Sequence, residues 1–209
     1  MEKSGRKHGW PRSIPLPRQR RARSAPPPRR PIFVVDVAVE SAEALVDRLQ
    51  EQGISPDEVV FKCVWPRYAP AADSGIRSLV KSENLVRQFE RLLAMHHEAP
   101  SAIPMPIGLV RNVDGDFVGY VLERVEGETL QALLERRALP EARRRLAAVE
   151  RTVAKLHARS IPHGDLNAAN IVAADDGRTV LIDPVANPGP GTALEDELSL
   201  KLLREQVAE

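Results

Sequence analysis

The part of this 209-residue chain that most restricts its fold is His163-Gly-Asp-Leu-Asn-Ala-Ala-Asn170, which is followed by Val180-Leu-Ile-Asp183. Asp165 and Asn170 lie on one predicted loop after a long helix, and Asp183 ends the second strand of a predicted hairpin. Because the hairpin turn brings Asp183 back beside the loop, one carboxylate and one amide oxygen can hold a hard cation such as Mg²⁺. The Asp165 carboxylate then remains to orient a hydroxyl group, and phosphoryl transfer needs this division of roles.

The same residues resemble the catalytic and metal-binding loops of the protein-kinase-like superfamily, in which H-[RG]-D-x-x-x-x-N is followed by D-F-G or Asp-Pro. The resemblance implies a two-lobed α+β fold, ATP and Mg²⁺ as cofactors, and transfer of a γ-phosphate to a hydroxyl group. It assigns Asp165 to the acceptor hydroxyl, and Asn170 and Asp183 to the metal. His163 is a structural residue in the family, so we expect it to brace the catalytic loop rather than to transfer protons.

Two upstream elements match further parts of this family pattern. Val59-Val60-Phe61-Lys62 resembles the V-A-I-K strand, which would place Lys62 at the α- and β-phosphates. The amphipathic helix predicted over residues 78–97 resembles the C-helix, which supplies a glutamate to hold that lysine. Glu83 and Glu90 are seven residues apart and lie on nearly the same face. We favour Glu90, which better fits the distance to the following strand, while Glu83 better fits the distance from Lys62 and stays open.

Val121-Leu-Glu-Arg-Val-Glu-Gly127 resembles the hinge between the two lobes. In this resemblance Leu122 is the gatekeeper, and the Glu123 carbonyl and the Val125 amide receive the edge of the adenine. These are backbone contacts, so the side chains at these positions carry little information about them.

Several features of the family are missing from the sequence. No G-x-G-x-x-G precedes Lys62, Gly164 replaces the arginine of H-R-D, and Asn167 replaces the lysine of many catalytic loops. Pro184 follows Asp183 and no A-P-E follows it, so the extended activation segment and most of the peptide-docking half are absent. This minimal pattern resembles the RIO-type kinases and the small kinases of the tRNA threonylcarbamoylation complex. Its Asp-Pro pair resembles the aminoglycoside and fructosamine phosphotransferases.

The formal net charge of +1 conceals a basic tail on an acidic body. Residues 1–31 carry ten Lys and Arg and one acidic residue, a balance of +9, whereas the remainder carries twenty against twenty-eight, a balance of −8. Seven prolines and few large apolar residues predict a tail that is disordered or locally extended as polyproline. The run Arg18–Arg23 is of the kind that contacts an anionic partner such as nucleic acid or an acidic membrane, although a solvated tail without a partner is the simpler interpretation.

The chain lacks the sequence features of membrane and secreted proteins. No apolar run approaches the roughly 18 residues that span a bilayer, and the basic N-terminus lacks the apolar stretch of a secretory signal. Cys63 is the single cysteine, which excludes an internal disulfide and fits a reducing compartment. We therefore expect a cytoplasmic protein without a transmembrane segment.

Apolar periodicity and turn residues predict an α+β order of elements rather than alternating β-α-β units. We expect a kinase-like domain over residues 32–209, with a reduced sheet in an N-lobe of about residues 32–122 and a truncated, helical C-lobe of about residues 126–209. Strands are predicted at Ile32–Val39, Glu58–Val64, Ile107–Asn112, Phe117–Arg124, Asn170–Ala173 and Thr179–Asp183. Helices are predicted at Ser41–Gln52, Ser78–His97, Thr129–Arg136, Pro140–Arg159 and Leu194–Val207.

Three functions fit these observations. A minimal ATP-dependent serine/threonine protein kinase is favoured, because Lys62, Asp165, Asn170 and Asp183 are all present. A small-molecule phosphotransferase is suggested by Asp183-Pro184. A nucleotide-binding pseudokinase or interaction module is suggested by the missing glycine-rich loop and the short C-lobe. The sequence does not identify the hydroxyl acceptor.

Overall fold

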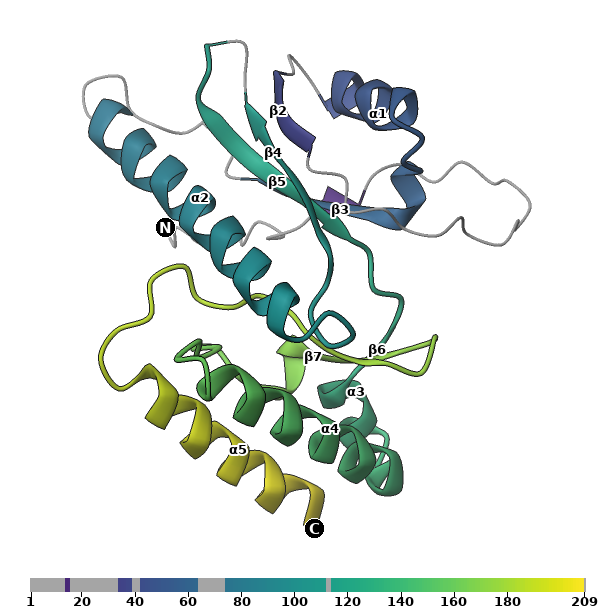
Figure 1. Ribbon diagram of the computed structural model, residues 1–209. Helices are drawn as coiled ribbons and strands as arrows, with labels where there is room; N and C mark the ends of the chain where they lie inside the picture. Colours follow the sequence, from purple (N-terminus) through teal and green to yellow (C-terminus); the bar gives the residue numbers. More distant parts are fainter. Residues whose placement is uncertain (1–13, 16–33, 39–41, 64–73, 112–113, 209) are drawn as a thin grey trace, which may run out of the picture.

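The computed structural model describes residues 14–15, 34–38, 42–63, 74–111 and 114–208. These residues form an upper part built on a five-stranded sheet and a lower part of helices around a three-stranded sheet (Figure 1). Mixed helices and small sheets in this order confirm the α+β class expected from the sequence, and the two parts fit the reduced two-lobed architecture.

The upper sheet is mostly antiparallel. In spatial order its strands are β1 (Ile14–Pro15), β3 (Val59–Cys63), β5 (Phe117–Glu123), β4 (Pro106–Arg111) and β2 (Val34–Ala38). β2 pairs in parallel with β4, whereas the other neighbours are antiparallel. The strand predicted at Ile32–Val39 is therefore present as β2, at the edge farthest from β1.

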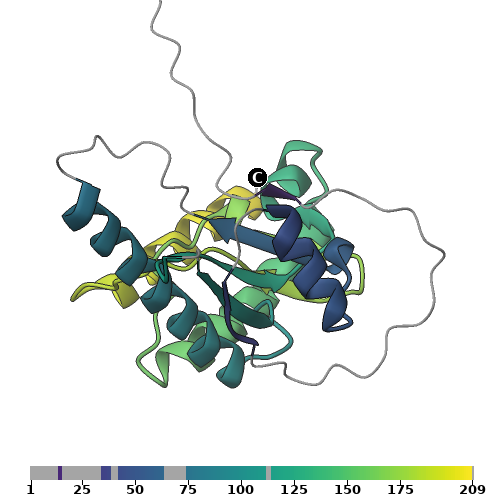
Figure 2. The ribbon, with the colours of Figure 1, turned by 90° about the horizontal axis from the view of Figure 1, so that it is seen from above.

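Helices cover both faces of this sheet. Alternate residues of β5 point to opposite faces, so that Tyr120 packs with α2 (Ser74–Glu98) and Val121 packs with α1 (Ala42–Glu51). Figure 2 shows the two helices on opposite sides of the sheet. Lys62 lies directly opposite Tyr120 in the β3–β5 register and so belongs to the α2 face.

Strand β1 differs from the expectation for the basic tail. Ile14 and Pro15 fall in the segment predicted to be disordered, yet they pair with Phe61 and Val60 of β3. Ile14 is one of the few large apolar residues of the tail, and proline is tolerated on an edge strand because it needs no ladder hydrogen bond there. The rest of residues 1–31 lies outside the described residues.

The lower part contains three helices and a small antiparallel sheet. The helices are α3 (Leu130–Glu135), α4 (Leu139–His157) and α5 (Thr192–Ala208), and the strands are β6 (Gly127–Thr129), β7 (Ile171–Ala174) and β8 (Thr179–Leu181). β6 was not predicted, because a three-residue polar segment has no readable periodicity. Gly127 has φ 147°, and a Cβ there would overlap the Ala173 carbonyl of β7, so only glycine fits.

One apolar core joins the two parts. Leu92 and Met95 of α2 belong to the same buried cluster as Val149 of α4 and Leu203 of α5. A second cluster lies between α1 and the outer face of the sheet. No helix in the described part of the chain has the length and apolarity needed to cross a bilayer.

Candidate active site

An ion pair between the two parts of the molecule marks the candidate site. The Lys62 ammonium lies 2.8 Å from Asp183 Oδ1 and 2.9 Å from Oδ2, although the two residues are 121 positions apart in the sequence. Their side chains are 15% and 26% exposed, so the pair is protected but still open to solvent. The structure therefore brings together two of the residues that the sequence assigned to phosphate and metal.

The backbone around Asp183 fixes the direction of its carboxylate. Asp183 follows β8 with φ 57°, in the left-handed region that few residues other than glycine, asparagine and aspartate adopt. The next residue, Pro184, accepts a hydrogen bond at its carbonyl from Gln88 Nε2 of α2, at 2.9 Å. Helix α2 thus contacts the loop that carries Asp183.

Two asparagines hold the Asp165 side chain. Asn170 Nδ2 donates to Asp165 Oδ2 at 3.0 Å and to its carbonyl at 2.8 Å, and Asn167 Nδ2 donates to Oδ1 at 3.1 Å. The Asn167 side-chain oxygen in turn accepts from the amides of Ala169 and Asn170, at 2.9 and 3.2 Å. Asn167 is therefore the cap that starts the short turn Ala168–Asn170, and it fixes the carboxylate without adding charge.

The short β7–β8 hairpin returns Asp183 to the loop, as the sequence predicted. Ile171 pairs with Leu181, and the Ile182 amide donates to the Asn170 carbonyl at 2.9 Å. Within the described residues no three His, Cys, Asp or Glu side chains converge on one point. The predicted metal set, Asn170 and Asp183, supplies two oxygen ligands, which suits Mg²⁺ because this ion is usually completed by phosphates and water.

His163 is buried, with 1% of its surface exposed, and it lies inside the loop. Its Nδ1 accepts a hydrogen bond of 3.4 Å from the Asp165 amide, which requires this nitrogen to be unprotonated. Burial lowers the pKa of His163 below its usual 6.5, and the opposing charges of Asp196 and Asp165 do not offset it. This environment fits the bracing role expected from the sequence.

Gly164 is required by the backbone at its position. It has φ 81°, and a Cβ would overlap the side chains of Val185 and Thr192. The replacement of the family's arginine by glycine therefore accompanies a tight approach of the loop to α5.

Asp196 of α5 is the main site residue that the sequence did not reveal. Its carboxylate is 1% exposed and accepts from the amides of His163 and Gly164, at 2.6 and 2.8 Å. Oδ2 also lies 2.9 Å from His157 Nε2 of α4. A buried carboxylate thus joins the loop that carries Asp165 to two helices. The available indication was an aspartate at the helical spacing of the buried residues Thr192, Leu200, Leu203 and Val207.

The structure does not bring Glu90 to Lys62. Glu90 is exposed on α2, and the described partner of Lys62 is Asp183. Helix α2 instead faces the loop after Asp183 with polar residues: Asn84 accepts from Asn187 Nδ2 at 2.8 Å, next to the Gln88 contact. The reason is the helical phase, since Glu90 lies about 200° around the helix from Gln88. The side chain of the alternative, Glu83, lies outside the described residues.

The segment predicted to be the hinge contains an unexpected side-chain anchor. Glu123 is buried at the end of β5, where Oε2 accepts from the Met105 amide at 3.0 Å and Oε1 accepts from Arg178 Nη2 at 2.8 Å. Burial alone would lower the pKa of Arg178, but its hydrogen bonds to Glu123 and Asp176 raise it above its usual value. The sequence assigned only backbone roles to Glu123 and Val125, and the side chain of Glu123 joins the sheet to the β7–β8 turn.

Tyr120 and Leu122 form the inner wall beside Lys62. Both are buried, and the Tyr120 ring centroid lies 6.0 Å from that of Phe89 of α2. Burial, together with the charge of Asp183, raises the pKa of Tyr120 well above its usual value, so its hydroxyl stays protonated. The gatekeeper role of Leu122 remains a prediction.

Comparison with known proteins adds a family context to this geometry. The model of the lipopolysaccharide kinase (Kdo/WaaP) family matches residues 86–184, a range that holds Asp165, Asn170 and Asp183 but not Lys62 or Asp196. The KEOPS complex subunit Bud32 of Pyrococcus abyssi (strain GE5 / Orsay) is 32% identical over 104 residues. A probable bifunctional tRNA threonylcarbamoyladenosine biosynthesis protein of Methanoculleus marisnigri (strain ATCC 35101 / DSM 1498 / JR1) is 32% identical over 143 residues.

These matches cover parts of the proteins. The first spans 50% of this chain and 44% of the Pyrococcus protein, and the second spans 68% of this chain and 22% of the Methanoculleus protein. The chain therefore matches less than half the length of either relative.

Proposed function

Because the chain belongs to the protein-kinase-like superfamily, we propose that it is an ATP- and Mg²⁺-dependent phosphotransferase. The observation that carries the proposal is the meeting of Lys62, Asp183 and the Asp165–Asn170 loop at the junction of the two sheets. A cation, two potential metal ligands and a carboxylate oriented by neutral donors are the groups that phosphoryl transfer requires.

The proposed roles follow from what holds each group. Lys62 would bind the phosphates. Asp183 would then give up its contact with Lys62 and would hold the metal beside them. Asp165, fixed by Asn167 and Asn170, would accept or orient the proton of the acceptor hydroxyl. When bound, Mg²⁺ neutralises charge on the phosphates, and Asn170 and Asp183 would hold it.

The nucleotide would lie along the inner face of the sheet. The Glu123 carbonyl and the Val125 amide would receive the adenine edge, beside Leu122. Support comes from the anchoring of this segment, since the Arg124 amide donates to the Glu58 carbonyl at 2.7 Å and Glu123 is held by Arg178. A fixed hinge keeps the two backbone groups in place before the ligand arrives.

We propose a serine or threonine hydroxyl of a protein as the acceptor. The Pyrococcus relative is a subunit of a complex, which favours a protein partner for this chain too. The proposed dependence on ATP favours the cytoplasm as the location of the enzyme. The basic tail, residues 1–31, would bring the enzyme to an anionic partner. Glu90 would contact Lys62 only after α2 turns or shifts, and Glu83 stays the alternative partner.

A sugar hydroxyl is the second candidate acceptor. The matching family model is that of lipopolysaccharide kinases, and Asp183 is followed by proline as in the small-molecule kinases of this superfamily. A nucleotide-binding pseudokinase is the third possibility, since no glycine-rich loop precedes Lys62 in the sequence.

The test is phosphate transfer from [γ-³²P]ATP by the full chain, to itself, to a generic protein substrate and to a panel of amino sugars. We expect Mg²⁺-dependent labelling that falls by at least about 100-fold in Asp165→Asn and Asp183→Asn, since one proton-transfer or metal-binding group supplies that much. Asp175→Asn, which alters an exposed carboxylate on the adjacent turn, is the matched control and should keep its rate. Phosphoserine or phosphothreonine in the product identifies the protein acceptor. Thermal stabilisation by ATP without any transfer would contradict the enzyme and favour the pseudokinase.

A further inference from the structure

Helix α5 has a second apolar face that the fold does not use. Its inner face carries the buried residues Asp196, Leu200 and Leu203. Leu194, Leu198 and Leu202 point the other way and are 59%, 54% and 59% exposed. Among the described residues these are the large apolar side chains that remain exposed, and all three fall on one stripe of one helix.

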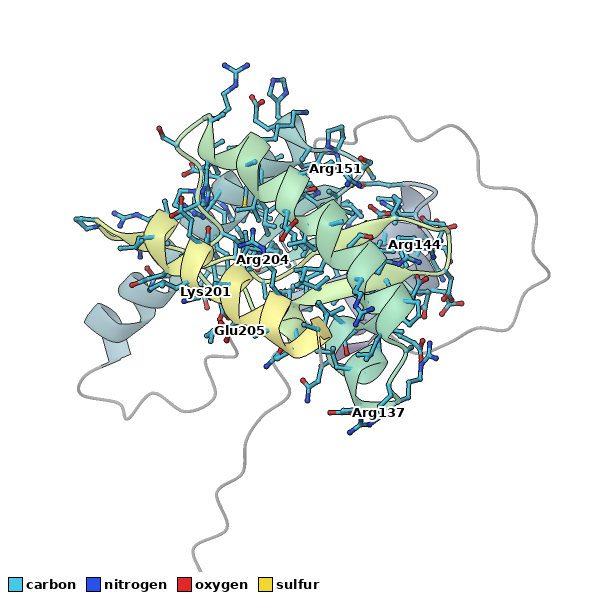
Figure 3. All side chains as sticks on the ribbon, turned by 90° about the horizontal axis from the view of Figure 1, so that it is seen from below. Arg137, Arg144, Arg151, Lys201, Arg204 and Glu205 are labelled. Atoms are coloured by element: carbon cyan, nitrogen blue, oxygen red, sulfur yellow. The ribbon has the colours of Figure 1, made fainter. Side chains whose placement is uncertain are left out.

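Their spacing makes the stripe continuous. The three leucines are four residues apart, so successive side chains advance by about 40° around the helix and about 6 Å along it. Figure 3 shows α5 on the lower face of the molecule beside α4, with Lys201, Arg204 and Glu205 along it. Scattered exposed leucines are ordinary on a protein surface, but a contiguous apolar stripe with a charged border is typical of an interface.

We propose that this stripe pairs two copies of the chain through antiparallel α5 helices, with a twofold axis at Leu198. Such a contact is self-complementary, because each copy presents the same surface. Leu198 would meet its own equivalent, and Leu194 would meet Leu202 of the second copy. The apolar stripe would then be covered along its whole length.

The charges beside the stripe fit this arrangement. In an antiparallel pair centred on Leu198, Lys201 lies on the same flank as Glu197 of the second copy and within about one helical turn of it. Glu205 lies opposite the first turn of the second α5, whose amides carry the positive end of the helix dipole. A parallel pair would instead place the two Glu205 side chains next to each other.

Acidic residues also argue against a lipid surface as the occupant. The exposed acidic residues of α5 (Glu195, Glu197 and Glu205) outnumber its exposed basic residues (Lys201 and Arg204), so an anionic membrane is a poorer occupant than a second copy. The three leucines expose well under the area of about 800 Å² per partner that a standard interface buries. We therefore expect a weak dimer whose formation depends on concentration. This inference does not rest on the proposed activity.

The first test measures the mass of the full chain by sedimentation equilibrium over a range of concentrations. The wild-type chain should shift from monomer to dimer as concentration rises. Leu198→Glu should stay monomeric, because two carboxylates would meet at the axis, while circular dichroism should show an unchanged fold. Ala193→Glu adds the same charge at an exposed position of α5 away from the stripe and should still dimerise.

The second test places the axis. Facing helices 8–10 Å apart bring directly opposed Cα atoms to about 5 Å, within the range for a disulfide. Under mild oxidation Leu198→Cys should form a covalent dimer, whereas Ala193→Cys and the wild type should not. A wild-type chain that stays monomeric at every concentration, including one that binds vesicles of anionic lipid as a monomer, overturns the proposal. So does a dimer that Leu198→Glu leaves intact or that Leu198→Cys does not crosslink.

Discussion

At the scale of single residues, Asp196 links the chemistry to the fold. Its carboxylate accepts hydrogen bonds from the amides of His163 and Gly164 and contacts His157. These contacts attach the loop that carries Asp165 to α5. Each of these hydrogen bonds joins a charged acceptor to a buried or half-buried donor, which makes it stronger than a neutral one. Asp196 makes these contacts rather than facing the groups that we propose to react, so we expect it to position them.

We expect Asp196→Asn to lower kcat by roughly 10- to 100-fold while KM for ATP changes little, because a misplaced loop affects the transfer step more than nucleotide binding. In this variant one oxygen of the carboxylate is replaced by an NH₂ group, which cannot accept the hydrogen bond of the backbone amide that faces it. His157→Gln changes only one of the three contacts and should have a smaller effect. Steady-state kinetics on both variants separate the two constants. Equal changes in kcat and KM would contradict a positioning role.

The buried imidazole of His163 gives the stability a pH dependence. The unfolded chain binds a proton at this residue at about pH 6.5, whereas burial lowers the pKa in the folded state. Between the two values the unfolded state holds more protons, so the free energy of unfolding falls as pH falls from about 6.5 through the folded pKa. Urea unfolding at about pH 7.5 and about pH 5.5 should show this loss.

The residue responsible can be identified with two variants. His163→Gln should be less stable at both pH values but should lose less between them, because the titrating group is gone. His97→Gln, which changes an exposed histidine of α2, should retain the wild-type loss. An unchanged pH dependence in His163→Gln would assign the effect to another group.

At the scale of elements, the segment predicted to be the hinge is held by side chains as well as by backbone. Glu123 at the end of β5 bonds the Met105 amide and Arg178 of the β7–β8 turn, so one carboxylate spans both sheets. Arg178 also contacts Asp176. The predicted adenine-binding segment is thereby fixed at its start.

We expect Glu123→Gln to destabilise the protein by about 1–3 kcal/mol, because the half-buried guanidinium of Arg178 loses its buried, charged partner while Asp176 remains. Nucleotide affinity should fall as well, since the hinge becomes less ordered. Glu126→Gln, an exposed neighbour, is the matched control. Thermal unfolding and ATP titration measure the two effects. Unchanged values for Glu123→Gln would mean that the pair does not support the hinge.

The elements also show what the sequence could reveal. α2 and α4 have one apolar stripe each, and the β7–β8 hairpin has a clear turn, so all were predicted near their observed bounds. β1 and β6 contain only two and three residues and have no periodicity to read. α5 carries leucines on both faces, so its periodicity could not separate the inner face with Asp196 from the outer one.

The same limits apply to the site. Asp165, Asn170 and Asp183 are tied to one loop and one hairpin, whose local geometry the motif spacing encodes. The partner of Lys62 depends on how α2 is rotated against the sheet, which spacing along the chain does not fix. In the described state Glu90 lies on the exposed face of α2, and only the tertiary packing of Asn84 and Gln88 reveals this orientation of the helix. The assignment of Glu90 to Lys62 stays a prediction.

At the scale of the whole molecule, a continuous core predicts cooperative unfolding. Leu92 of α2 is buried with residues of α4 and α5, and Tyr120 connects the same cluster to the sheet. The opposite face of the sheet is covered by the cluster around Leu49 of α1. Since β5 contributes to both clusters, neither cluster can unfold without exposing apolar residues of the other.

We therefore expect a single calorimetric transition, with equal calorimetric and van't Hoff enthalpies, for the described part of the chain. Leu92→Ala and Leu49→Ala remove the same volume from the two clusters, and each should cost about 2–5 kcal/mol. Because the clusters share the sheet, both variants should move the whole transition to lower temperature without splitting it.

The Lys62–Asp183 pair is partly exposed and contributes little to this coupling, so added salt should leave the shape of the transition unchanged. Two resolved peaks in Leu49→Ala alone would show that the α1 layer unfolds independently, and two peaks in the wild type would show that the upper and lower parts are separate cooperative units.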